Sequence, residues 1–202
     1  MGANASTPKG VLIILAAGLG TRLGGRDKGA LPWPQGATLL GHQLVVAEAA
    51  GFESLAVVRG GDVALPQRVV NRSPQDGLAS SLKIGLKAAR DRFGEVTLGI
   101  LLVDQPFVTP EDILTVYEAF QRRPSDVHAV RARYDGTPGH PVFFDSHWDG
   151  RVSQLHGDRG LGPLWTTSED ARWVDIAVGG RPHPAFDIDT DEAYLKALTW
   201  VK

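Results

Sequence analysis

The sequence predicts an α/β fold with a doubly wound, mostly parallel sheet and helices on both faces, in a single domain. Residues 11–15 form a short, continuous apolar run, which is typical of a strand buried on both faces of a parallel sheet. A glycine-rich turn follows this run. Further apolar runs at residues 55–58 and 97–103 alternate with helical patterns. Strands that alternate with helices favour parallel pairing, with the helices as crossovers.

Length, composition and charge narrow the class of protein. With 202 residues, of which 43% are hydrophobic and 22% charged, the chain can bury one core. No apolar run is long enough to span a bilayer, and a net charge of −2 without a basic cluster argues against nucleic acid as a partner. The absence of cysteine excludes disulfides and a thiol nucleophile. Residues 1–9 are predicted to be a flexible N-terminal tail without signal-peptide character, residues 10–202 to be the domain, and the location to be cytoplasmic.

The predicted elements follow in order along the chain. Strands are expected at residues 11–15, 55–58, 68–71, 97–103, 127–133, 141–144 and 173–178. Helices are expected at residues 38–50 and 146–155, and from about residues 78, 111, 163 and 191. Thr38 is the predicted N-cap of the first helix, which Gly51 ends, and Thr190 or Asp191 caps the last one. Residues 136–140 are predicted to form a turn.

The glycine loop after the first strand has the composition of an anion-binding loop. Gly18 and Gly20 accept backbone angles closed to other residues, and Arg22 and Lys28 add positive charges. A P-loop would need Ser or Thr after the lysine, but Gly29 follows Lys28. A dinucleotide fingerprint would open a helix inside the motif, but more glycines and two prolines follow. A plain turn with two solvated cations is the alternative.

Asp104 is the second feature that points to a site. It ends the apolar run at residues 97–103, and the carboxyl end of a parallel strand faces the crevice where such sheets bind ligands. The next helix has its own start signals around Glu111, so Asp104 is not needed to cap it. Most of the candidate residues follow strands in this way, and they can therefore share one crevice.

The loop LAAGLGTRLGGRDKGAL resembles the signature loop of the MobA-like nucleotidyltransferases, which join a nucleotide to molybdopterin. Later segments resemble further motifs of that family in the same order, namely residues 71–82, LVDQP, GHPVFF, the GDRG loop and DIDT. The resemblance covers nearly the whole chain and implies a Rossmann-like nucleotidyltransferase fold.

The resemblance also implies roles for individual residues. The catalytic residues would be Arg22, Lys28 and Asp104. The nucleotide would contact Leu15, Ala16, Ala17, Gly18, Gly20, Thr21, Asp76, Gly77, Ser80 and Ser81. The acceptor would contact His140 and Asp158, and Mg²⁺, which prefers hard oxygen ligands, would be held by Asp104 with Asp189. The residues alone leave other roles open, because Asp76, Ser80, Ser81 and Asp158 can cap helices and a lone histidine is often structural.

The implied reaction transfers a nucleoside monophosphate from a nucleoside triphosphate to the terminal phosphate of molybdopterin and releases pyrophosphate, with a molybdoenzyme as a recipient partner. The segments LAAG, GLASSL, DQP and DIDT resemble the cytidylyl-transferring branch, whereas GGRDKG resembles the guanylyl-transferring one, so CTP is favoured over GTP. One alternative is an NAD(P)H-dependent reductase, in which the glycine loop binds a pyrophosphate and Arg59 meets a 2′-phosphate. The other is a non-catalytic molybdopterin carrier.

Overall fold

The computed structural model describes residues 9–60 and 67–201. Its strands are β1 Val11–Ala16, β2 Pro32–Trp33, β3 Ala37–Thr38, β4 Glu53–Val58, β5 Arg68–Val70, β6 Leu98–Leu102, β7 Ala129–Tyr134, β8 Thr137–Phe144 and β9 Ala171–Ile176. Its α-helices are α1 Leu39–Ala49, α2 Leu78–Phe93, α3 Pro110–Gln121, α4 Asp149–Ser153, α5 Leu164–Thr167 and α6 Asp191–Trp200. Short 3₁₀ turns cover Thr21–Leu23, Lys28–Ala30, Pro74–Asp76 and Ser146–Trp148.

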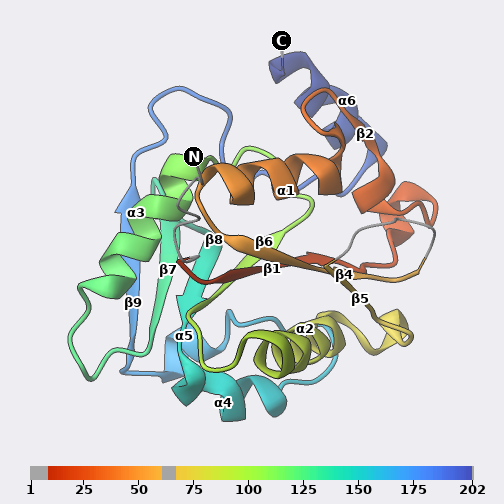
Figure 1. Cartoon of the computed structure of the whole chain (residues 1–202). Helices are drawn as coiled ribbons and strands as arrows, with labels where there is room; N and C mark the ends of the chain where they lie inside the picture. The colour runs from red at the N-terminus through yellow and green to blue at the C-terminus, as the bar shows by residue number, and fades with distance from the viewer. Residues whose placement is uncertain (1–8, 61–66, 202) are drawn as a thin grey trace, which may run out of the picture.

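The described residues form three layers, with one sheet between two layers of helices, as Figure 1 shows. Among them, seven strands pair in the order β5-β4-β1-β6-β8-β7-β9, while β2 and β3 form a separate ribbon. Strands β5, β4, β1 and β6 are parallel, β8 is antiparallel to both β6 and β7, and β7 is parallel to β9. The predicted doubly wound, mostly parallel sheet is therefore confirmed.

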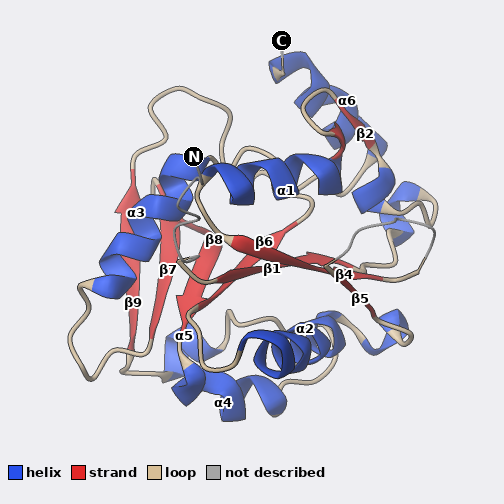
Figure 2. Ribbon diagram, viewed as in Figure 1, coloured by secondary structure: helices blue, strands red, loops and turns tan. Residues whose placement is uncertain are grey.

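Helices cover both faces of this sheet (Figure 2). Helices α1, α3 and α6 pack on one face, and α2, α4 and α5 pack on the other. Every residue of β1 is buried, because Leu12 and Ile14 face the first helix layer while Ile13 and Leu15 face the second. This double burial is why the strand is a continuous apolar run. No helix in the described ranges is both long and apolar enough to cross a membrane.

The chain's beginning is described only from Lys9. Most of the predicted tail, residues 1–8, lies outside the described residues. The Lys9 ammonium donates a hydrogen bond to the carbonyl oxygen of Ala50 at 3.1 Å, and the Tyr117 hydroxyl donates to the Lys9 carbonyl oxygen at 3.0 Å. Lys9 is thus attached to the end of α1 and to α3.

The start signals of the helices were mostly predicted. The Thr38 hydroxyl accepts a hydrogen bond from the Gly41 amide at 3.0 Å, and Thr190 caps α6 in the same way. Helix α2 differs, because its N-cap is Gly77 and no side chain caps it. The Ser80 hydroxyl instead donates to the Gly77 carbonyl oxygen at 2.8 Å.

The predicted turn at residues 136–140 is wrong beyond Gly136. Strand β8 begins at Thr137, and the hairpin turns on two residues with positive φ, Asp135 at 46° and Gly136 at 86°. Such a two-residue connection matches the twist of the flanking strands, so no longer turn is needed. His140 therefore lies within β8. The register pairs Ile100 with Val142, which puts His140 beside the carboxyl end of β6.

We expect the same substitution to act oppositely in two helices. A Cβ at Gly41 in α1 would lie 2.0 Å from the backbone oxygen of Gly36, whereas a Cβ at Gly150 in α4 would meet no atom within 4 Å. Gly41→Ala should lower the free energy of unfolding by about 1–3 kcal/mol, because backbone must move to relieve the overlap. Gly150→Ala, the control, should leave it unchanged or raise it by up to about 1 kcal/mol through helix propensity. Urea unfolding measures both, and equal effects would contradict the packing described.

Candidate active site

The glycine loop folds back on itself directly after β1. Gly20 has φ 63°, and a Cβ at this position would lie 2.1 Å from the Arg26 carbonyl oxygen. The amides of Leu23 and Gly25 both donate to the Gly20 carbonyl oxygen, at 2.8 and 2.9 Å. Only glycine fits this crossing of the backbone.

Arg59, which follows the neighbouring strand β4, binds the backbone of the glycine loop. Its guanidinium donates to the carbonyl oxygens of Leu19 at 2.9 Å and Gly25 at 2.7 Å, and Asp27 lies 3.9 Å away. From the sequence alone, Arg59 could be an exposed loop residue or a contact for a 2′-phosphate. The pairing of β1 with β4 puts Arg59 beside the loop, and its donors bind the loop backbone instead.

The ammonium group of Lys28 bridges two carboxylates. It lies 2.6 Å from Oδ2 of Asp104 and 2.5 Å from Oδ1 of Asp189, and Nη1 of Arg22 lies 2.8 Å from the other oxygen of Asp189. The side chains of Lys28 and Asp104 are only 15% and 19% exposed, whereas Arg22 is 73% exposed. Burial alone would lower the pKa of Lys28, but the two carboxylates outweigh it and raise the pKa, so the amine stays charged. The bridge is therefore the well-shielded part of this charge cluster, and Arg22 is its solvated edge.

Three distant segments form this bridge. Lys28 follows β1, Asp104 follows β6, and Asp189 immediately precedes α6. Strands β1 and β6 are parallel neighbours, so their carboxyl ends meet. The Ile188 amide donates to the Asp104 carbonyl oxygen at 2.9 Å, which holds the segment of Asp189 against the end of β6.

A cavity of about 440 Å³ opens beside the bridge, a volume suited to a small-molecule ligand. The structure brings most of the predicted site residues to its wall: Leu15, Ala16, Ala17, Gly18, Gly20, Thr21, Arg22, Lys28, Gly77, Ser81, Asp104, Asp158 and Asp189. The other lining residues were not predicted as site residues: Leu19, Pro74, Gln75, Leu78, Leu102 and Val103.

Asp76, Ser80 and His140 do not line this cavity. The Ser80 hydroxyl accepts a hydrogen bond from the Asn71 amide group at 2.8 Å, and the same amide group lies 3.0 Å from the Ser81 hydroxyl. These bonds shape the turn before α2. Nδ1 of His140 lies 2.9 Å from Oε1 of Gln105.

The start of α2 and the loop that carries Asp158 form one wall. Gly77 has φ 83°, and a Cβ there would lie 2.3 Å from the backbone carbon of Gly157. The Ala79 amide donates to the Gly157 carbonyl oxygen at 3.0 Å. Asp158, predicted on the acceptor side, is therefore tied to the predicted nucleoside side through backbone contacts.

The carboxylate oxygens in the cavity are suitable ligands for a divalent cation. Asp104 and Asp189 offer hard carboxylate oxygens of the kind that Mg²⁺ and Mn²⁺ prefer. Their two negative charges balance Lys28 and Arg22, so a bound polyanion would need a further cation to be neutralised. Asp104 with Asp189 would hold that ion.

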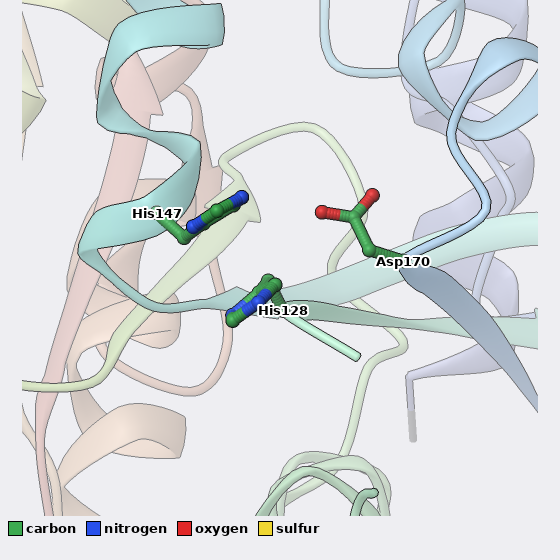
Figure 3. Close-up of side chains that lie close together, drawn as sticks. All are labelled: His128, His147 and Asp170. Carbon is green, nitrogen blue, oxygen red and sulfur yellow. The ribbon is translucent and has the colours of Figure 1, made fainter. Parts of the chain in front are cut away.

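A second cluster of potential ligands lies at the opposite end of the sheet. His128, His147 and Asp170 place one ligand atom each within 4.8 Å of the others (Figure 3). The two imidazole rings are stacked, with centroids 3.9 Å apart and planes 13° apart, so their in-plane lone pairs run side by side rather than toward one point. Asp170 already accepts hydrogen bonds from Arg151 at 2.6 Å and from the indole of Trp148. We assign this cluster a structural role.

Known proteins have sequences and structures similar to this chain. The family model described as "MobA-like NTP transferase domain" matches residues 12–172. The bifunctional protein GlmU of Gluconobacter oxydans (strain 621H) is 30% identical over 158 residues, which cover 75% of this chain and 32% of GlmU. The chain thus spans about a third of that relative's length.

Two solved structures have the same fold over nearly their whole length. Rv0371c from Mycobacterium tuberculosis H37Rv is 27% identical with a TM-score of 0.74, and the match covers 95% of this chain and 98% of that one. Rv0371c in complex with manganese matches at 25% identity and a TM-score of 0.71, covering 94% and 97% of the two chains. Because the family model matches most of the chain, the chain belongs to the MobA-like NTP transferase family.

Proposed function

We propose that the protein transfers a nucleoside monophosphate, with CMP favoured, from a nucleoside triphosphate to the terminal phosphate of molybdopterin. The observation that supports this most is the Lys28 ammonium between Asp104 and Asp189, beside a glycine loop and a cavity of small-molecule size. The resemblance of the motifs to the MobA-like nucleotidyltransferases, which join a nucleotide to molybdopterin, supports the choice of acceptor.

The reaction needs charge neutralisation more than it needs a protein nucleophile. A terminal phosphate oxygen of the acceptor attacks the α-phosphorus, the bond between the α-phosphorus and the bridging oxygen breaks, and pyrophosphate leaves with the electron pair. Lys28 and Arg22 stabilise the charge on the α-phosphate and on the departing pyrophosphate. A divalent cation held by Asp104 and Asp189 would supply further neutralisation of the triphosphate.

Different features of the chain support the choice of nucleotide and the choice of acceptor. CTP is favoured because most of the motifs resemble the cytidylyl-transferring branch, although GGRDKG resembles the guanylyl-transferring one. The reductase alternative loses its main support, because Arg59 donates to the loop backbone. Asp158, at the cavity wall, is the residue proposed to contact the acceptor.

The reaction can be tested directly. We expect the protein, incubated with Mg²⁺ or Mn²⁺, molybdopterin and CTP, to release pyrophosphate and form a cytosine dinucleotide of the cofactor, with GTP turned over more slowly. Chromatography of the product and a pyrophosphate assay measure this. Oxidation of NADPH without added metal would favour the reductase, and molybdopterin binding without any dinucleotide would favour the carrier.

Replacement of the Lys28 side chain should change turnover and metal affinity in opposite directions. Lys28→Met should lower turnover by about a hundredfold, the typical cost of one transition-state charge contact. It should also tighten Mn²⁺ binding in the absence of nucleotide, because the ammonium no longer competes for the two carboxylates. Lys87→Met is the matched control, because Lys87 pairs with the exposed Asp91 on α2. Near-normal turnover of Lys28→Met would remove Lys28 from the catalytic groups.

A substitution at the α2 end of the cavity should impair nucleotide binding. Gly77→Ala should raise the KM for nucleotide on the order of tenfold, because the new Cβ displaces the backbone at Gly157 and narrows the cavity. Gly94→Ala is the control, because Gly94 also has a positive φ, 71°, but no atom lies within 4 Å of its Cβ position. Equal KM values for the two variants would show that the cavity is not the nucleotide site.

A further inference from the structure

A chain of side-chain hydrogen bonds runs from β8 toward the bridged carboxylates. Nδ1 of His140 lies 2.9 Å from Oε1 of Gln105. The amide nitrogen of Gln105 donates to Oδ1 of Asp187 at 2.9 Å. Gln105 is only 5% exposed, and neither Gln105 nor Asp187 has a role in the reaction proposed above.

The direction of this chain is fixed by protonation. Burial, together with the positive charge of Arg131, lowers the pKa of His140 to about 3, so the ring is neutral at physiological pH and carries one N–H. Because Gln105 uses its amide nitrogen on Asp187, its oxygen must accept from His140. The proton of His140 is therefore on Nδ1.

We propose that His140, Gln105 and Asp187 are positioning residues that set the separation of the two metal-binding carboxylates, Asp104 and Asp189. This inference rests on the proposed function of that site. Gln105 is the neighbour of Asp104, and Asp187 stands two residues before Asp189. The Gln105 side chain therefore ties the two ligand segments together beside the backbone bond from Ile188 to Asp104.

The contact with Asp187 depends on which end of the Gln105 amide faces it. The amide nitrogen donates to Oδ1 of Asp187, while the amide oxygen lies against Nδ1 of His140. An amide that is held in one orientation by His140 always presents its N–H to Asp187. A free amide could rotate and present its oxygen, which would repel the carboxylate.

His140 contacts the side chain of Gln105, whereas other residues contact the backbone around it. The backbone on the other side of Gln105 is fixed separately, since the Gln43 amide donates to the Gln105 carbonyl oxygen at 2.8 Å and the His42 ring lies 2.8 Å from the Pro106 carbonyl oxygen. His42 therefore contacts the backbone of the same loop, and His42 is a matched control for His140.

The test measures Mn²⁺ affinity in the presence of CTP by electron paramagnetic resonance. His140→Leu and Gln105→Leu should weaken Mn²⁺ binding by about tenfold to a hundredfold. This is the usual effect of losing a residue that helps to orient a metal ligand. His140→Asn should restore it, because the asparagine amide nitrogen, like Nδ1, is separated from Cβ by Cγ alone. His42→Leu should leave Mn²⁺ affinity unchanged, and thermal unfolding records any general loss of stability in each variant.

Three results would overturn the inference. The first is His140→Leu or Gln105→Leu with the Mn²⁺ affinity of the parent. The second is His140→Asn with no better affinity than His140→Leu. The third is a long-range ¹H–¹⁵N spectrum of the histidines that shows the His140 proton on Nε2. Absence of nucleotidyl transfer with every triphosphate would refute the proposed function instead, and the spectrum would still test the hydrogen-bond chain.

Discussion

The contact of the Lys28 ammonium with the carboxylates of Asp104 and Asp189 is the constraint on which the arrangement of the site depends. An ammonium and a carboxylate that are both largely shielded from water are stable only when they are paired closely. Lys28 must therefore reach the end of β6, and the loop that carries it must be tight enough to bring it there. The backbone crossing at Gly20 and the two bonds from Arg59 supply that tightness.

The sequence predicted the frame of this site because the frame depends on local signals. A strand buried on both faces must be a continuous apolar run, and residues 11–16 are one. Residues that follow parallel strands share one edge of the sheet, which is why Arg22, Lys28 and Asp104 could be expected in one crevice. The structure does bring these three together with Asp189.

The supporting contacts could not be predicted, for a physical reason that Arg59 and Gln105 illustrate. Arg59 binds carbonyl oxygens of the loop, and backbone acceptors leave no signature in the residue types around them. Gln105 has an amide whose orientation is set by a histidine 35 residues away, and composition carries no information on orientation. The prediction of a turn at residues 136–140 was wrong for a related reason. Glycine and proline suggested a long turn, but two residues with positive φ complete the hairpin.

The two cations of the site differ in how readily they can change partners. Arg22 is mostly exposed, and an exposed ion pair contributes only about 0–1 kcal/mol, so a phosphate can replace Asp189 as its partner at little cost. Lys28 is shielded and holds two carboxylates, so it can turn to a phosphate only if another cation takes its place between them. Under the proposed function, Asp104 and Asp189 would hold a divalent cation in place of the ammonium, and that charge would free Lys28 for a phosphate. Metal and nucleotide should therefore bind together better than either binds alone.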